Sequence, residues 1–188
     1  EVIRDLVHYR WLGDVYKIKL HTHINDECSR GTLRFVQERF AKICLRSCLS
    51  NLSVQFRTSK DEGPKLIVGS MTSEQENLDT LMHIIVAQNI GWDVTYVGGN
   101  IPHDELIHIA NKISARAMVL AFNNSRDISR KAHEIKVIKN ESEQRDNIVL
   151  IGSEVHNFRQ LADDVKAIIS NDLSSFRLTM ERLYGLIR

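Results

Sequence analysis

Residues 66–79 read Leu-Ile-Val-Gly-Ser-Met-Thr-Ser-Glu-Gln-Glu-Asn-Leu-Asp. A short apolar segment runs into a loop of small residues, and this loop opens an amphipathic helix. In an open α/β sheet, the loop that follows the first strand is a place where the fold meets a ligand. The stretch therefore predicts an α/β domain with a ligand crevice beside this loop.

The chain after this stretch continues to alternate strand and helix patterns. We expect strands at 65–69, 92–97, 117–122, 147–151 and 166–169. The helix that begins near Glu74 has apolar residues at helical spacing on one face, and Gly91 is its expected C-cap. Later helices are expected after Pro102, where Leu106, Ile109, Ala110 and Ile113 share one face, and then over 128–139, near 161 and over 173–187. This alternation predicts a flavodoxin-like five-stranded parallel sheet, in the order 2-1-3-4-5, with helices on both faces.

The first 56 residues have a different sequence pattern from the rest. They contain no proline and show helical apolar spacing. At least two helices are expected, at about 1–20 and 26–50, packed as an antiparallel pair, and Gly31 is a weak point within the second. A polar stretch with Gly63-Pro64 follows and is the expected linker. The predicted domains are a helical bundle or cap over 1–56, a linker over 57–65 and an α/β domain over 66–188.

Composition argues against several classes of function. The 188 residues include 43% hydrophobic residues, which supply a core for one domain with a helical appendage. The formal net charge of +1 gives no electrostatic reason to expect direct binding of nucleic acid or an anionic membrane. No apolar run approaches the roughly 20 residues of a membrane span. The chain begins at Glu1 without a signal-peptide pattern, so we expect a segment of a longer, cytoplasmic protein.

The three cysteines, Cys28, Cys44 and Cys48, form no Cys-x-x-Cys pair. Cys44 and Cys48 are four residues apart and would share one helix face. We expect the cysteines to be small buried hydrophobic residues in a reducing cytoplasm, with redox sensing as the alternative.

Candidate ligand-binding residues lie where the expected strands end. The loops there are rich in glycine, serine and asparagine, which expose backbone N–H groups and leave space for a large planar or phosphate-bearing ligand. Ordinary turn chemistry is the alternative explanation of the same residues. The candidate cofactor-binding residues are Ser73, Glu74, Glu76, Gly98, Gly99, Asn123, Gly152 and Ser153.

Two of these candidates also have a purely structural explanation. Ser73 followed by Glu76 is the signature of a capping box, in which each side chain bonds the other residue's backbone N–H. Carboxylates in a first helical turn are favoured by the helix dipole as well. We therefore expect Ser73 and Glu76 to cap the helix, with a ligand or acid–base role as the alternative.

The sequence shows no arrangement typical of a catalytic or metal centre. His21 and His23, and likewise His103 and His108, have no cysteine or carboxylate placed to complete a tetrahedral metal site, so we expect solvated histidines. Neither a nucleophile–histidine pair nor a Gly-x-Gly-x-x-Gly segment can be identified. The third strand ends in Asn123 rather than in a phosphoacceptor aspartate. We therefore expect a protein that is not an enzyme.

The α/β part of the chain, from Leu66 to about Leu173, resembles cobalamin-binding domains of the regulatory type. Residues 91–98, Gly-Trp-Asp-Val-Thr-Tyr-Val-Gly, followed by Ile101-Pro102, match that family's Gly-Trp-x-Val-x-Tyr-Leu-Gly and Val-Pro pattern. Residues 73–79 are similar to its Gly-Glu-x-His-x-x-Gly segment. Gly152 and Ser153 stand where the family has its second Gly-Gly loop.

The helical part is similar to the bundle that precedes such domains in light- and redox-responsive transcription regulators. Residues 12–16, Leu-Gly-Asp-Val-Tyr, resemble the bundle's Leu-Gly-x-x-Trp. Residues 31–33, Gly-Thr-Leu, resemble a segment of the haem- or cobalamin-sensing domains of purple-bacterial photosynthesis antirepressors. The resemblance implies a cytoplasmic signal-transduction domain that senses a tetrapyrrole, next to a flavin photoreceptor or a transcription regulator as fused domain or partner.

This chain departs from the family at the metal-binding segment. Glu76 replaces the axial histidine, Asp79 the following glycine, and Ser73 the opening glycine. Cobalamin, haem held by another histidine such as His83 or His103, and no cofactor therefore all stay open, as does the oligomeric state. The leading hypothesis is a sensor, or a relay acting through protein contacts. A corrinoid-carrying subunit of a methyltransferase or mutase and a pure interaction module are the alternatives.

Overall fold

The computed structural model describes residues 26–27, 30–31, 34–57, 63–71, 78–122, 128–143, 147–153 and 155–185. The chain divides into two compact units, Glu1–Leu52 and Ser53–Arg188. The predicted domains, with their linker at 57–65, stay a prediction.

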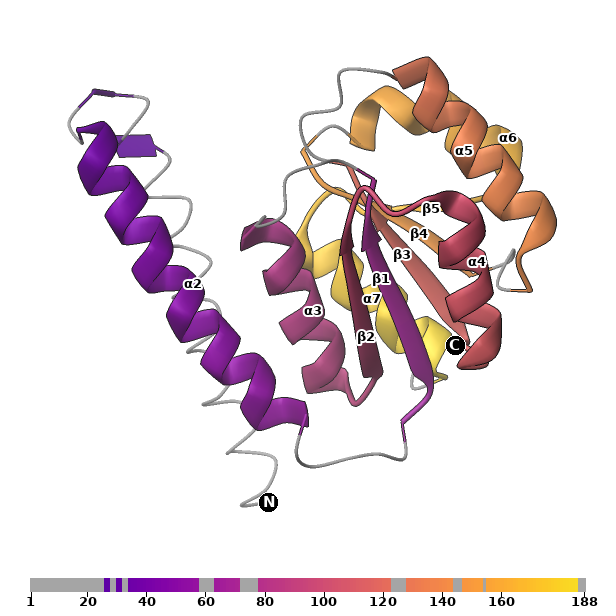
Figure 1. The fold of residues 1–188 in the computed structure, drawn as a ribbon, viewed down its shortest axis with the longest axis horizontal. Coiled ribbons are helices and arrows are strands. Elements are labelled where there is room, and N and C mark those ends of the chain that lie inside the picture. Colours follow the sequence, from indigo (N-terminus) through magenta and orange to yellow (C-terminus); the bar gives the residue numbers. More distant parts are fainter. Residues whose placement is uncertain are drawn as a thin grey trace. The chain divides into compact units, whose positions relative to one another are not determined.

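The second unit is built on a parallel sheet of five strands in the order β2-β1-β3-β4-β5 (Figure 1). The strands are β1 (Lys65–Ser70), β2 (Asp93–Gly99), β3 (Ala117–Ala121), β4 (Ile148–Ile151) and β5 (Ile168–Ile169). Every residue of β3 and β4 is buried, which explains why these segments are continuously apolar rather than alternating. The predicted fold class and strand order are confirmed.

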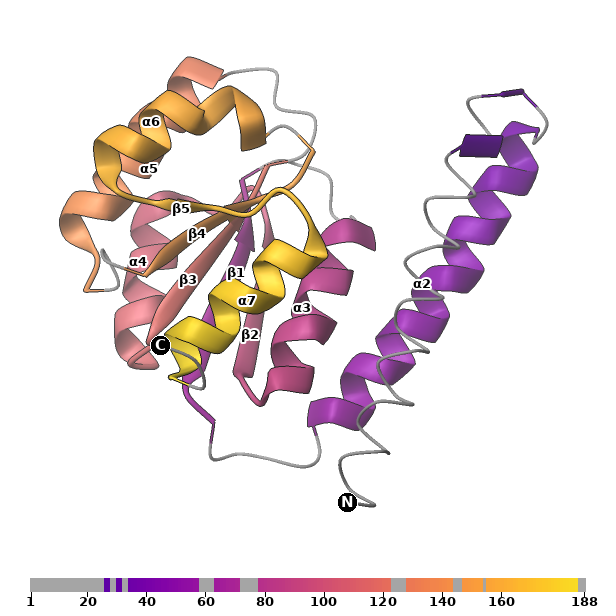
Figure 2. The same cartoon turned by 180° about the vertical axis from the view of Figure 1, so that it is seen from behind.

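Helices cover both faces of this sheet, as the opposite views of Figures 1 and 2 show. They are α3 (Leu78–Ile90), α4 (His103–Lys112), α5 (Ile128–Glu141), the short 3-10 helix η1 (Val155–Phe158), α6 (Arg159–Val165) and α7 (Leu173–Tyr184). Apolar side chains of α3 and α7 share one core cluster with the sheet. Those of α4, α5, η1 and α6 form the cluster on the other face.

The turn between α3 and β2 is tied to α7. Gly91 adopts a φ of +117°, and its N–H donates to the carbonyl of Gln88 at 3.0 Å, so it ends α3 as expected. The indole N–H of Trp92 donates to the carbonyl of Met180 at 3.2 Å. The Trp92 ring also meets the Tyr184 ring edge-on, with 5.7 Å between centroids. The Gly-Trp pair thus holds the sheet and α7 together.

Helix α7 is delimited by strong local signals at both ends. The Asp172 carboxylate accepts from the Ser175 N–H at 2.7 Å, and the Asp172 N–H donates to the Ser175 hydroxyl at 3.2 Å, which makes a capping box. Gly185, with a φ of +91°, follows the last turn. The helix therefore ends at Tyr184, and the expectation that it continues to about residue 187 is wrong because Gly185 takes the left-handed conformation.

Helix α2 (Phe35–Arg57) makes up most of the described part of the first unit, and its residues from Ser53 onward belong to the second. Its bounds differ from the predicted helix at 26–50: residues 30–31 form a turn in which Gly31 has a φ of +73°, and no glycine or proline stops the helix before Gly63-Pro64. The predicted helix at 1–20, and with it the antiparallel pair, lies outside the described residues. Among the helices that the structure describes, none is long and apolar enough to cross a membrane.

Candidate functional site

The carboxyl ends of the parallel strands meet at one edge of the sheet, where α/β folds bind their ligands. Backbone hydrogen bonds continue the sheet just past its strands at this edge. The Met71 N–H donates to the carbonyl of Ala121 at 2.9 Å, and the Phe122 N–H donates to that of Ile151 at 2.8 Å. These bonds hold the starts of the loops after β1 and β3 in place.

At the end of β2, the backbone opens a space that no side chain of the described residues fills. Gly98 has a φ of +87°, and a Cβ built on it would find no atom within 4 Å. The pairing with β1 shifts register here, so that Gly99 lies opposite Ser70. The Asn100 N–H then donates to the Ser70 carbonyl at 2.9 Å, with a φ of +54° at Asn100. This irregular end leaves bare, half-buried backbone at Gly98 and Gly99.

The end of β4 presents a second turn of small residues at the same edge. Gly152 has a φ of +114°, and its carbonyl accepts from the Val155 N–H at 3.3 Å as η1 begins. Ser153 is exposed. Because β1 and β3 lie between β2 and β4, the two turns are three strand spacings apart, which is about 14 Å at roughly 4.8 Å per spacing. A ligand that reaches both turns must be as broad as a macrocycle.

Half of the predicted site residues can be placed in this way. Gly98 and Gly99 are the last two residues of β2, and Gly152 and Ser153 follow β4, so all four lie at the carboxyl edge of the sheet. The other four candidates, Ser73, Glu74, Glu76 and Asn123, lie outside the described residues. Their roles in capping or in ligand binding therefore stay predictions.

His83 lies in the interface between α3 and α7 and is only 7% exposed. Its Nδ1 lies 2.6 Å from the carbonyl oxygen of Asp79, so Nδ1 carries the proton and donates. Its ring meets Phe176 of α7 edge-on, with 4.7 Å between centroids, and Nε2 has no hydrogen-bond partner. Burial lowers the pKa of His83, although the Asp79 carbonyl and the charges of Asp79 and Asp172 act in the opposite direction.

A neutral, enclosed imidazole of this kind is a part of the helix interface rather than a metal ligand at the edge. A haem iron could reach His83 Nε2 only if α3 and α7 separated. Haem ligation by His83 is therefore not supported by the packing.

His103 has a different position from His83. It is half-buried and is the first residue of α4, directly after the loop that leaves β2, and this places it at the carboxyl edge. His108, His133 and His156 are exposed. Among the residues that the structure describes, no three histidine, cysteine or acidic side chains are arranged to hold a metal ion. The predicted pair His21 and His23 lies outside them.

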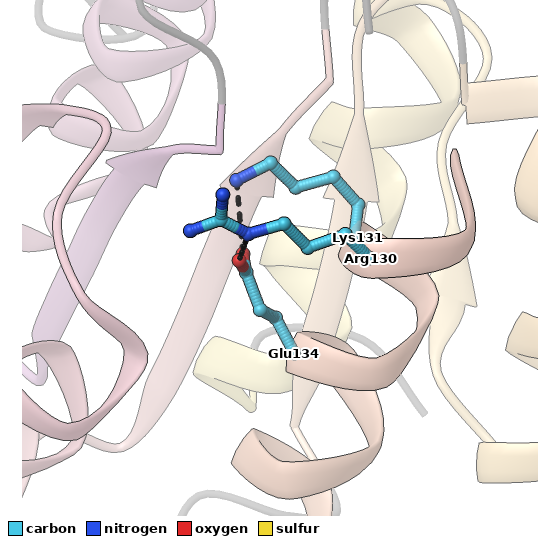
Figure 3. Close-up of polar contacts among 3 residues, drawn as sticks. All are labelled: Arg130, Lys131 and Glu134. Atoms are coloured by element: carbon cyan, nitrogen blue, oxygen red, sulfur yellow. Dashed lines mark hydrogen bonds and ion pairs between the residues drawn. The ribbon is translucent and has the colours of Figure 1, made fainter. Parts of the chain in front are cut away.

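A charged cluster on α5 was not singled out by the sequence analysis (Figure 3). The Glu134 carboxylate accepts from Arg130 Nε at 3.0 Å and from Lys131 Nζ at 2.9 Å. The side chains of Glu134 and Lys131 are 11% and 14% exposed, whereas that of Arg130 is 72% exposed. The spacing i, i+3 and i, i+4 on a helix could have indicated these pairs. Since α5 follows the loop after β3, its first turns bring this cluster, of net charge +1, near the carboxyl edge.

Comparison with solved structures shows the same fold in corrinoid proteins. The monomethylamine corrinoid protein of Methanosarcina barkeri is 11% identical, with a TM-score of 0.64 over 86% of this chain and 78% of that one. A cobalamin-binding protein from Desulfitobacterium hafniense DCB-2 is 13% identical, with a TM-score of 0.55 over 96% and 90%. No protein-family model and no curated protein matches the sequence.

A third similar structure is the methanol:cobalamin methyltransferase complex MtaBC from Methanosarcina barkeri. The identity is 8% and the TM-score 0.52, over 88% of this chain and 64% of the other. At such low identities the likeness establishes the fold alone. The fold is that of cobalamin-binding domains, which confirms this part of the resemblance noted in the sequence.

Proposed function

We propose that this protein binds a corrinoid over the carboxyl edge of its sheet and acts as a non-enzymatic regulatory domain. The open backbone at Gly98 is the observation that carries the proposal, because space beside a φ of +87° admits a ligand that any larger residue would exclude. The turn at Gly152 lies about 14 Å away across the edge, a breadth that suits a corrin ring. The similar solved structures support the same ligand class.

The residues at this edge fit a corrinoid in shape and offer it polar contacts. Gly98, Gly99 and Gly152 leave backbone groups accessible to polar groups of the ligand. Two of the described histidines, His103 of α4 and His156 of η1, follow the carboxyl ends of strands, and the half-buried His103 is our candidate to approach the metal. A bound corrinoid would supply a cobalt centre able to carry an exchangeable methyl or adenosyl group.

The regulatory role rests on Glu76. This carboxylate stands where the resembling domains have their axial histidine, and cobalt accepts nitrogen ligands more readily than a carboxylate. A corrinoid held without that imidazole is suited to reporting the presence or state of the cofactor. The signal would pass to a transcription regulator or fused sensor domain through the helical unit that contains α2.

The second candidate is a corrinoid-carrying subunit of a methyltransferase. Two of the similar structures favour it, since one is a monomethylamine corrinoid protein and the other a methanol:cobalamin methyltransferase complex. This role requires the cobalt to accept and release a methyl group in repeated turnovers.

Titration of the purified chain with hydroxocobalamin, adenosylcobalamin and haemin tests the binding. We expect the corrin absorption bands to shift on binding and Gly98→Asn to weaken the affinity. Gly185→Asn is the matched control, because Gly185 has nearly the same φ, +91°, with no atom closer than 4.0 Å to an added Cβ, and it lies at the end of α7. Absence of any shift with both cobalamins would refute the proposal.

The two roles are separated by experiments on the loaded protein. The cobalamin-loaded chain is reduced and treated with iodomethane, and then offered a thiol acceptor. A carrier forms methylcobalamin and passes on the methyl group over many cycles. A regulatory domain does not turn over, but its protease sensitivity or oligomeric state changes between the loaded and unloaded forms. The variant His103→Gln should alter the cobalt spectrum only if its imidazole approaches the metal.

A further inference from the structure

Helix α2 presents two thiols on one side. Cys44 and Cys48 are both exposed, and neither forms a disulfide. The prediction that the cysteines are buried hydrophobic residues is therefore wrong for Cys44 and Cys48. Residues four apart on a helix have Cβ atoms about 5–6 Å from one another, so both sulfurs can reach the same point above the helix.

This separation does not suit a disulfide between the two cysteines. A disulfide needs Cβ atoms roughly 3.5–4.5 Å apart, so closing one here would distort the helix. A single metal ion between the sulfurs bridges a wider gap. With metal–sulfur bonds of about 2.3 Å, a linear arrangement spans roughly 4.6 Å from sulfur to sulfur, which rotation of the two side chains can provide.

The surroundings of the pair favour a soft ion with few ligands. The helix positions one turn from either thiol hold Phe40, Ala41, Leu45, Ser47, Asn51 and Leu52, none of which is a carboxylate or an imidazole. Within the described residues no group of three potential metal ligands occurs. Thiolates select Cu(I), zinc and iron–sulfur clusters. Structural zinc and the clusters take about four protein ligands, so Cu(I) is the member of this group that a pair of thiolates suits.

Neighbouring polar groups already have partners elsewhere on the helix. Lys42 pairs with Glu38 at 2.6 Å, and the Ser47 hydroxyl donates to the carbonyl of Ile43 at 3.1 Å. These contacts stabilise the turns around the two thiols without involving them. The helix thus provides a fixed support for the pair.

We propose that Cys44 and Cys48 form a two-thiolate site for a soft monovalent cation, with Cu(I) as the biological ligand and Ag(I) as its analogue. Two thiols lose two protons as one ion binds, and the product is a bis-thiolate complex of net charge −1. No electron is transferred in this step. The site lies on α2 and does not depend on corrinoid binding.

Titration of the reduced chain with Cu(I), under anaerobic conditions and against the chelator bicinchoninate, tests the site. We expect one tightly bound ion per chain, with two protons released, and the same stoichiometry with Ag(I). Cys44→Ser and Cys48→Ser should each abolish this tight binding. Circular dichroism of each variant checks that the helix content is unchanged.

A variant with the same number of thiols in a different arrangement is the sharpest control. In the double variant Cys48→Ser/Ser50→Cys the thiols are six residues apart, on different sides of the helix, and Ser50 is exposed as Cys48 is. We expect tight binding to be lost. Wild-type affinity in this double variant would refute the proposal. Cys28→Ser leaves the proposed pair intact, so loss of the tight site in that variant would also refute it.

Discussion

The two ends of β2 use glycine for opposite purposes. At its start, Gly91 brings the backbone against α7, where an added Cβ would lie 3.2 Å from the Tyr184 hydroxyl oxygen. At its end, Gly98 has no atom within 4 Å of the same position. Both glycines have positive φ and both belong to the segment that resembles cobalamin-binding domains. The backbone at the start of β2 is therefore tightly packed, and the backbone at its end is open. The sequence pattern alone does not distinguish the two glycines.

Replacement of Trp92 should have the largest effect on the packed end. The indole is 3% exposed and donates to the Met180 carbonyl. Trp92→Ala should lower the free energy of unfolding by about 3–5 kcal/mol, as for other buried aromatic residues. This loss of unfolding free energy can be measured by urea titration monitored by circular dichroism. Trp92→Phe retains much of the volume and should cost less; equal losses in both variants would contradict the packing role.

Gly91→Ala should have the next largest effect. An alanine there must adopt a φ of +117° and approach Tyr184, so we expect a loss of about 1–3 kcal/mol in unfolding free energy. Tyr184→Phe removes the hydroxyl that the new Cβ would meet. In the double variant, the penalty of Gly91→Ala should therefore shrink, and a strictly additive result in thermal unfolding would show that this contact is unimportant.

The interface that Trp92 stabilises should also respond to acid through His83. Its pKa is lowered mainly by burial, so the unfolded chain binds a proton near pH 6.5 while the folded chain still does not. The unfolded state then holds more protons, and stability, fully present above that pH, falls as the pH decreases toward the lowered pKa. Asp79 and Asp172, which face His83, moderate this effect.

The variant His83→Leu isolates this contribution. Unfolding free energies measured between pH 7.5 and pH 5 in wild type and variant should diverge as the pH falls, with the wild type losing more. The same substitution at the exposed His108 is the control and should leave the slope unchanged. Parallel curves for wild type and His83→Leu would mean that the pKa of His83 is the same in the folded and unfolded chain, which would contradict the prediction.

Substitution of Gly98, at the open end of β2, should have the smallest effect on stability. Gly98→Asn and Gly185→Asn each place a side chain at a φ near +90° with free space around it. Each should lower the free energy of unfolding by only about 1 kcal/mol, since asparagine tolerates this conformation. A much larger loss for Gly98→Asn than for Gly185→Asn would mean that the carboxyl edge is packed rather than open.

Much of the fold follows from local patterns, because a strand buried on both faces must be apolar throughout. This is why β3 and β4 could be predicted, whereas the order of the five strands was predicted from the strand–helix alternation and right-handed crossovers. The ends of elements were less predictable. Helix α2 begins at Phe35 and ends at Arg57, and neither limit follows from hydrophobic spacing alone, because turns such as that at Gly31 depend on backbone conformation.

The site residues divide in the same way. Glycines at strand ends can be recognised from turn chemistry, so the position of Gly98, Gly99 and Gly152 at the carboxyl edge could be predicted, whereas their role in binding stays a prediction. The Glu134 cluster was missed because charged residues on a helix are usually solvated, and nothing local shows that Glu134 is 8% exposed. Likewise, no sequence pattern distinguishes the enclosed His83 from the half-buried His103.

The alternation of strand and helix patterns along the chain was sufficient to predict the parallel sheet and its helices, and right-handed crossovers then favoured its strand order. It also placed the small residues of the loops near the carboxyl ends of the strands. Only the tertiary structure decided that Gly91 is packed while Gly98 is open, that His83 is enclosed and that Cys44 and Cys48 are exposed. These properties depend on which segments distant in the sequence come to lie against a residue, and local sequence carries little information about them.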